Sequence, residues 1–276
     1  MVDFTKQQLS KSQQIIADYI QKNIDNVPFM NELDISKACG TSVATVSRFW
    51  NAVGFQNLKD FKQYIKTAAN QVTPASKVEA SLRKYENGYT PFMLDSALHY
   101  LSDTKKHLAD QSFQQSIEKI ANAENIHLFG AGSSASLVSL FAFRLKRFNS
   151  NVYTFNSSGH EIFEDMIHMK KGDVLFLFGF VQASVEINVL LDYAKKKEIC
   201  TILMTDMLVS PLLEQATYTL YTSRGDVGEF HSMVAPIALI ESIVVNVGKQ
   251  MGDQALDKLH ELHQIRKDYH DRLPRK

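Results

Sequence analysis

The chain has 276 residues, of which 45% are hydrophobic and 22% are charged, and its formal net charge is zero. This length predicts about two globular domains, and the apolar fraction is ordinary for a soluble protein. The longest apolar runs are too short and too interrupted to span a bilayer, and the first residues lack the apolar stretch of a secretory signal. Cys39 and Cys200 lie far apart in the chain, so neither a disulfide nor a cysteine-based metal site is expected. The sequence therefore predicts a cytoplasmic protein with no membrane partner.

The first regular apolar pattern predicts helices. Residues 10–23 carry isoleucines and a tyrosine at helical spacing, which predicts an amphipathic helix. Pro28 then begins a short helical turn, and Asp34 is predicted to cap a helix over residues 35–39.

Residues 35–61 predict two helices joined by a tight turn. Gly40 allows the turn, Ser42 is a favourable N-cap for a second helix over residues 43–53, and Gly54 ends that helix. This arrangement predicts a helix-turn-helix, whose second helix can enter a DNA major groove. A plain helical hairpin with a solvated face fits the same spacing, so both interpretations stay open at this point.

The predicted second helix has two faces. The apolar residues that recur at helical spacing are expected to face the protein: Ala38, Val43, Val46, Phe49 and Val53. Short side chains and one long cation dominate the opposite face, where they could approach base edges. Under the DNA-binding hypothesis, the base-reading candidates are Ser42, Val43, Ala44, Thr45, Ser47 and Arg48.

Positive charge is concentrated around these two helices. Residues 35–66 hold five basic residues (Lys37, Arg48, Lys59, Lys62 and Lys66) against one acidic residue, Asp60. A local excess of this kind favours contact with phosphates. Lys37, Lys59 and Lys62 are therefore phosphate-contact candidates, although a solvated face explains any single lysine equally well.

The next segments predict a further helix and a linker. Residues 58–69 continue the helical pattern, and residues 71–77 contain Pro74 and small polar residues, as is typical of a linker. Residues 78–120 predict helices with a break near Asn87 and Pro91.

From Asn125 onward the pattern changes to strands that alternate with helices. The predicted strands cover residues 126–129, 152–155, 174–178, 201–204 and 218–221. The predicted helices cover residues 135–148, 184–197 and 233–247, followed by a polar helix over residues 253–273. This alternation predicts a doubly wound α/β sheet.

A glycine-rich turn follows the first predicted strand. In an open α/β sheet, ligands bind at the carboxyl ends of the strands, where Gly130-Ala131-Gly132-Ser133-Ser134 is expected to lie. The glycines allow close backbone approach, and the hydroxyls and free N–H groups suit an anion. The same residues fit a dinucleotide-binding pattern, so a nucleotide-binding enzyme stays as an alternative. However, the second strand ends at Asn156 rather than at an acidic residue that could bind the ribose.

Residues 40–49, 54–55 and 58–62 resemble the N-terminal domain of the RpiR family of bacterial transcription regulators. That family pairs this domain with a C-terminal sugar isomerase (SIS) domain, and the resemblance extends from Leu9 to about Gly248. It implies an all-α helix-turn-helix domain plus a doubly wound α/β SIS domain. Trp50 departs from the smaller residue expected there, and could fill the core or alter the contact surface.

The resemblance also implies the organisation and partners of the chain. The expected domains are a DNA-binding domain (1–76), a helical linker (77–110), an effector and dimerisation domain (111–252) and a helical tail (253–276). The expected partners are double-stranded DNA with an inverted repeat, a sugar phosphate or other carbohydrate-derived effector, and further copies in a homodimer or tetramer. No cofactor and no metal are expected.

The second half of the SIS phosphate site departs from the family pattern S-x-S-G-x-T. This sequence has Gly179-Phe180-Val181-Gln182-Ala183-Ser184, in which only the last hydroxyl is kept. Each lost hydrogen bond to a charged group costs about 1.5–3 kcal/mol. The sequence therefore predicts that the effector is not an ordinary sugar phosphate, or that sensing is weak or lost. A SIS fold kept only for dimerisation is the alternative.

The resemblance implies a set of effector-binding residues: Gly130, Gly132, Ser133, Ser134, Gln182, Ser184 and Glu229. Glu229 and His231 lie where SIS isomerases place acid–base residues, but the arginine expected soon after is replaced by Ala235-Pro236. The sequence therefore predicts that the chain is not an enzyme, and an isomerase-like enzyme with an accessory helical domain remains the alternative.

Overall fold

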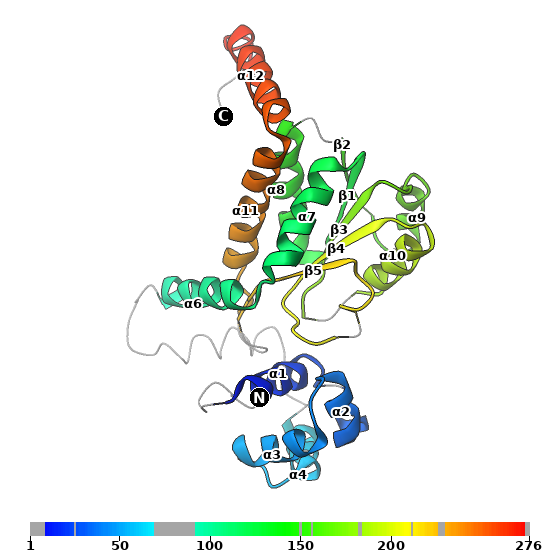
Figure 1. Cartoon of the computed structure of the whole chain (residues 1–276), viewed down its shortest axis with the longest axis vertical. Helices are drawn as coiled ribbons and strands as arrows, with labels where there is room; N and C mark the ends of the chain where they lie inside the picture. Colours follow the sequence, from blue (N-terminus) through cyan, green and yellow to red (C-terminus); the bar gives the residue numbers. More distant parts are fainter. Residues whose placement is uncertain are drawn as a thin grey trace.

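The computed structural model describes residues 9–24, 26–68, 92–148, 151–155, 157–181, 184–210, 212–225 and 230–273. A small helical domain lies at one end of the molecule and an α/β domain with a long C-terminal helix at the other (Figure 1). The predicted linker at residues 71–77 and the predicted helices before residue 92 lie outside the described residues.

The N-terminal domain is formed by helices packed around one apolar core. Its elements are α1 (Lys11–Lys22), the 3-10 helix η2 (Val27–Phe29), α2 (Glu32–Ala38), α3 (Val43–Ala52) and α4 (Leu58–Ala68). Ser42 caps α3, as the sequence predicts, and Ser10 caps α1 rather than being its first residue. Gly40 and Gly54 have φ of 60° and 89°, so glycine is favoured at both turns.

The start of α2 was predicted wrongly. The helix begins at Glu32, and its N-cap is Asn31 rather than Asp34. The Asn31 side chain accepts a hydrogen bond from the Asp34 backbone N–H at 3.0 Å, and the Asp34 carboxylate accepts one from the Asn31 N–H at 2.8 Å. Asp34 is therefore the third residue of a reciprocal capping box, in which an acidic side chain supports the cap from within the helix.

Trp50 fills the core of this domain. Its side chain is fully buried, with ring centroids 5.2 Å from Phe49 and 5.0 Å from Phe61. Val46 and Val53 are buried on the same face of α3. Of the two roles that the sequence left open for Trp50, the structure shows the packing role.

The C-terminal domain is built on a five-stranded parallel sheet with strand order β2-β1-β3-β4-β5. The strands are β1 (Asn125–Phe129), β2 (Asn151–Thr154), β3 (Val174–Phe178), β4 (Cys200–Thr205) and β5 (Tyr218–Tyr221). Helices α7 (Asp110–Asn122), α8 (Ala135–Leu145) and α11 (Val234–Met251) cover one face, and α9 (Ile162–Met166) and α10 (Val185–Lys196) cover the other (Figure 1). The predicted doubly wound α/β fold is confirmed, and all five strands begin and end within two residues of their predicted positions.

Two further helices lie at opposite ends of α11 (Figure 1). Helix α6 (Phe92–His107) lies near the N-terminal end of α11, and α12 (Asp253–Asp268) extends from its C-terminal end (Figure 1). Within the described residues, α11 alone is long and apolar enough to cross a membrane by length and composition. Its buried side chains, among them Leu239 and Ile243, belong to the core between the sheet and its helices.

Candidate functional site

The first residues of α3 form an exposed surface, called the α3 surface below: Ser42, Val43, Ala44, Thr45, Ser47 and Arg48. Thr45 is partly buried and the other five are exposed. The Ser42 hydroxyl accepts a hydrogen bond from the Thr45 N–H at 3.1 Å and lies 2.8 Å from the Thr45 hydroxyl. Arg48 donates from Nε to the Ala44 carbonyl at 3.1 Å, so its guanidinium lies along this surface.

Val43 was expected to face the protein, and this is wrong. Its side chain is 41% exposed, because the buried stripe of α3 begins one turn later, at Val46, and continues through Phe49, Trp50 and Val53. Val43 thus belongs to the first, outward-facing turn of the helix. It lies beside Ala44 on the surface that would approach a base edge.

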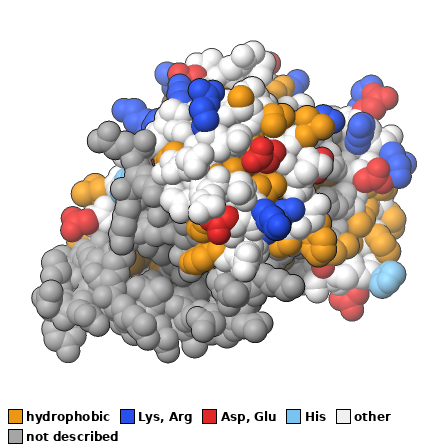
Figure 2. Space-filling model, turned by 90° about the horizontal axis from the view of Figure 1, so that it is seen from below, with side chains coloured by type: hydrophobic (Ala, Val, Ile, Leu, Met, Phe, Trp, Pro, Cys, Tyr) orange, Lys and Arg blue, Asp and Glu red, His pale blue; other side chains and the backbone are white. Residues whose placement is uncertain are grey.

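The predicted phosphate-contact lysines lie on α2 and α4, the two helices that pack against α3, and do not form a continuous patch (Figure 2). Lys37 and Lys59 are exposed and Lys62 is partly buried. Figure 2, which views the molecule from the end that carries α2, α3 and α4, shows basic side chains dispersed among acidic, apolar and uncharged ones. The electrostatic attraction of one copy for phosphate is therefore modest.

In the glycine-rich turn, Gly130 packs closely against the following helix. A Cβ on Gly130 would lie 3.0 Å from the Ser134 Cβ and 3.1 Å from its carbonyl oxygen, and Gly132 has a φ of 59°. A single 3-10 turn, η3 (Gly132–Ser134), leads into α8. Ser134 is buried and Ser133 is exposed, so the two predicted hydroxyls lie in different environments.

The second predicted effector loop is held by polar contacts. Val181 has a φ of 62°, which is strained for a β-branched residue, and its N–H donates to the Asp206 carboxylate at 2.7 Å. The Ser184 hydroxyl accepts from the Ile187 N–H at 3.4 Å and caps α10. The one hydroxyl kept from the family pattern therefore also has a local structural role. Gln182 and Glu229 lie outside the described residues.

Arg224 was not identified from the sequence. It follows β5 at the carboxyl edge of the sheet, is only 5% exposed, and places its guanidinium carbon 4.4 Å from the centroid of the Phe180 ring. Its Nε donates to the Ser232 carbonyl at 3.4 Å. Burial lowers the pKa of Arg224, and the nearby Asp206 carboxylate opposes that shift. A lone arginine directly after an apolar strand is the only sequence signal that could have indicated it.

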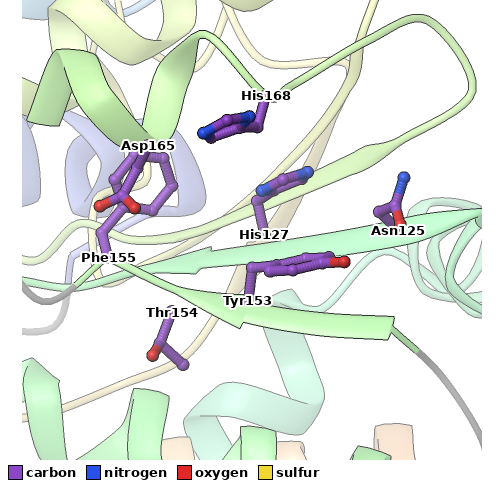
Figure 3. A pocket seen from close by; sticks show the side chains of 7 residues that line it. All are labelled: Asn125, His127, Tyr153, Thr154, Phe155, Asp165 and His168. Carbon is purple, nitrogen blue, oxygen red and sulfur yellow. The ribbon is translucent and has the colours of Figure 1, made fainter.

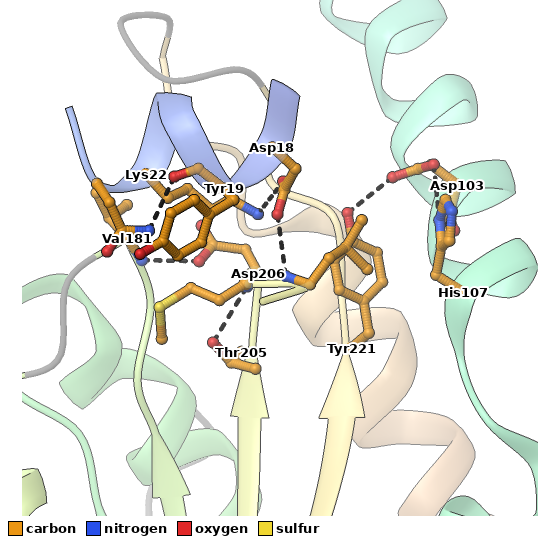
Figure 4. Close-up of polar contacts among 12 residues, drawn as sticks. Asp18, Tyr19, Lys22, Asp103, His107, Val181, Thr205, Asp206 and Tyr221 are labelled. Atoms are coloured by element: carbon orange, nitrogen blue, oxygen red, sulfur yellow. Dashed lines mark hydrogen bonds and ion pairs between the residues drawn. The ribbon is translucent and has the colours of Figure 1, made fainter. Parts of the chain in front are cut away.

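The N-terminal domain contacts the same edge of the sheet. The Asp18 carboxylate on α1 accepts a hydrogen bond at 3.1 Å from the backbone N–H of Leu208, in the loop after β4 (Figure 4). Asp18 also pairs with Lys22, whose Nζ lies 5.8 Å from the Tyr221 ring centroid. Tyr221 in turn donates to Asp103 of α6 at 2.9 Å. These contacts form the domain junction, and no sequence pattern predicted them.

Burial dominates the electrostatics of the junction. Desolvation raises the pKa of Asp18, and the attraction of Lys22 opposes this shift. The loop after β4 contacts both domains, since Asp206 accepts from Val181 in the predicted effector loop and Leu208 donates to Asp18. The effector loop and α1 are thus separated by one short segment of chain.

A cavity of about 320 Å³ lies elsewhere, beside β1 and β2 (Figure 3). The buried His127 forms its floor, with Nε2 3.1 Å from the Asp173 carboxylate and its ring stacked on Tyr153 at 5.3 Å. Asn125 donates to the same carboxylate at 2.7 Å. His127 is therefore a satisfied core histidine, and this cavity lies apart from the residues that the sequence assigned to the effector.

Comparison with known proteins identifies both halves of the chain. The family model described as "Helix-turn-helix domain, rpiR family" matches residues 2–71, and the one described as "SIS domain" matches residues 119–246. An uncharacterised HTH-type transcriptional regulator of Caldanaerobacter subterraneus subsp. tengcongensis is 25% identical, over 85% of this chain and 84% of the relative. One from Clostridium perfringens is 23% identical, over 90% and 91%. The structure of "the Vibrio vulnificus NanR protein complexed with ManNAc-6P" has the same fold, with a TM-score of 0.60, 24% identity and 94% coverage of both chains.

Proposed function

Since the chain belongs to the RpiR family of transcription regulators, with a helix-turn-helix domain and a SIS domain, we propose that it binds operator DNA through the α3 surface and responds to a small carbohydrate derivative. The observation that carries this proposal is the exposed first turn of α3. Its short side chains and Arg48 face solvent, while Val46, Phe49 and Trp50 anchor the helix from behind. A rigid helix with an exposed N-terminal half suits insertion into a major groove.

Two copies are needed in this proposal. The basic charge near α3 is modest, so one copy would bind weakly, and two α3 helices on an inverted repeat would bind together. In this proposal, Arg48 and the first turn of α3 contact bases, and the phosphates are contacted by Lys37, Lys59 and Lys62. The SIS domain would supply the dimer contact and the effector site, in the cytoplasm where the DNA lies.

A regulator fits the observations better than an enzyme does. Two relatives that align with this chain over most of both sequences are described as transcriptional regulators. The loop from Gly179 to Ser184 also lacks most hydroxyls of the family's phosphate site. The NanR complex supports a phosphorylated amino sugar as one ligand to try.

A gel-shift titration with the chain's own upstream DNA tests the proposal. Arg48→Ala is expected to weaken specific binding by about tenfold or more, because a bidentate arginine–base contact contributes roughly 1–3 kcal/mol. Arg272→Ala is the matched control, since Arg272 is exposed on the C-terminal segment, far from α3 in the chain. Equal affinities for the wild type and Arg48→Ala would remove Arg48 from the DNA contact.

A further inference from the structure

Three chain segments meet on one side of the carboxyl edge of the sheet. Phe180 after β3 and Leu220 of β5 belong to the core that packs against α8 and α11. Gly130, after β1, packs against Val138 of that same core. Arg224 reaches from the end of β5 across the end of β4 to stack on Phe180. The guanidinium therefore lies at the edge where an α/β sheet binds ligands.

The buried charge of Arg224 is poorly compensated. Among the residues that the structure describes, the guanidinium contacts the Ser232 carbonyl and the Phe180 ring, and no carboxylate forms an ion pair with it. Asp206 acts on it from a longer distance, and its Oδ1 already accepts from the Val181 N–H. A guanidinium has five donors, and among the described residues only the one on Nε has an acceptor. The terminal nitrogens are not fully buried, so they remain accessible to an incoming acceptor. Such a site favours an anion that supplies the missing acceptors.

The Thr222 hydroxyl is a second polar group of interest at this edge. Its side chain is fully buried, and its hydroxyl has no hydrogen-bond partner among the described residues. Its N–H donates to the Thr205 carbonyl at 2.8 Å and extends the pairing of β4 and β5. Because side chains alternate along an extended strand, Thr222 shares the face of Leu220, which is also the face of Arg224 and Phe180. Two alternate positions after β5, Thr222 and Arg224, thus offer polar groups on one side of the sheet.

We propose that Arg224, with Thr222 beside it, binds the anionic group of the effector in place of the hydroxyls that the loop from Gly179 to Ser184 has lost. A guanidinium fork matches the two oxygens of a phosphate or a carboxylate. This inference rests on the proposed regulatory function and names the chemistry of its effector. The ligand is an anion that Arg224 and Thr222 bind at the carboxyl end of β5.

The first test compares charged and neutral ligands by thermal unfolding and calorimetric titration of the full chain. Inorganic phosphate and ManNAc-6P, set against N-acetylmannosamine, form the phosphate arm, and gluconate set against glucose forms the carboxylate arm. We expect an anion of at least one arm to raise the unfolding midpoint, and its neutral counterpart to leave it unchanged. A wild type that responds to no anion in either arm would overturn the inference.

The second test uses Arg224 variants with a matched control. Arg224→Met is expected to weaken anion binding by about tenfold to a hundredfold, and Arg224→Lys by less, because Lys keeps the charge but loses the fork. Arg147→Met is the control, since Arg147 also places its guanidinium over a ring, 4.8 Å from the Phe143 centroid. Without ligand, Arg224→Met should unfold at the wild-type temperature or above, because it removes an unpaired buried charge.

The outcomes that contradict this inference distinguish a wrong assignment of Arg224 from a purely structural role of its side chain. Wild-type anion affinity in Arg224→Met, or an equal loss of anion affinity in Arg147→Met, would overturn the assignment of Arg224. A ligand-free midpoint well below that of the Arg147→Met control would show a structural role instead. DNA binding measured on the same preparations tests the proposed function separately: intact DNA binding without any anion response contradicts only this inference.

Discussion

At the scale of single residues, the sequence predicts a role well where that role depends on neighbours in the chain, and poorly where it depends on distant residues. Gly40, Ser42 and Gly54 were predicted correctly, because backbone freedom and capping depend on immediate neighbours in the chain. Val43 was placed wrongly, because periodicity gives the direction of a side chain but not what covers it. Arg224 was missed, since its significance depends on Phe180, which is distant in the sequence.

Trp50 gives the residue-scale prediction. Trp50→Ala should lower the free energy of unfolding of the N-terminal domain by about 3–5 kcal/mol, because it leaves a large cavity between Phe49 and Phe61. Trp50→Phe should cost much less, since the buried indole N–H has no hydrogen-bond partner among the described residues. Circular dichroism during thermal unfolding measures both changes. A folded Trp50→Phe variant that no longer binds DNA would place Trp50 in the contact surface instead.

At the scale of elements, the order and bounds of the strands followed from the sequence, but the contacts between domains did not. Alternating apolar strands and helices are recognisable locally, so the bounds of β3 and β5 were predicted without error and those of β1 within one residue. The domain junction joins Asp18 of α1 to Leu208, and Lys22 of α1 to the ring of Tyr221, which itself bonds Asp103 of α6. No local pattern marks such contacts, because Asp18 and Tyr221 are ordinary polar residues in their own elements and Leu208 contributes only its backbone N–H.

The junction should respond to pH. Burial raises the pKa of Asp18 when α1 is docked, and exposure in an undocked state would return it toward 3.8. The docked state therefore binds the proton more tightly, so docking is strongest below the ordinary pKa and weakens as pH rises through the raised value. The groups that face Asp18 are Lys22, Asp206, Tyr221 and Cys39.

Hydrogen exchange at the Leu208 amide, corrected for the intrinsic rate, measures docking directly, because this N–H donates to Asp18. Its protection should fall as the pH rises above about 4 in the wild type, because the pKa of docked Asp18 is raised. Asp18→Asn keeps a side-chain acceptor but cannot titrate, so its protection should vary less over the same range. An identical pH profile for the two proteins would assign the effect to another group, with Asp206 the nearest candidate.

At the scale of the whole molecule, the domain that carries the proposed DNA-reading helix contacts the sheet edge that carries the proposed effector site. The loop after β4 contacts the predicted effector loop through Asp206 and α1 through Leu208. A ligand that binds unequally to the docked and undocked arrangements would shift the balance between them. The family resemblance predicted both domains, while the physical link between them required the structure.

Hydroxyl-radical footprinting of the full chain on its own upstream duplex tests the central claim most directly. The account predicts two protected patches on one side of the duplex, about 34 Å or a multiple of that distance apart, as expected for two α3 helices in successive major grooves. Both patches should disappear with Arg48→Ala and persist with Arg272→Ala. Protection that Arg48→Ala leaves unchanged, or no protection of any duplex at low ionic strength, would contradict the account.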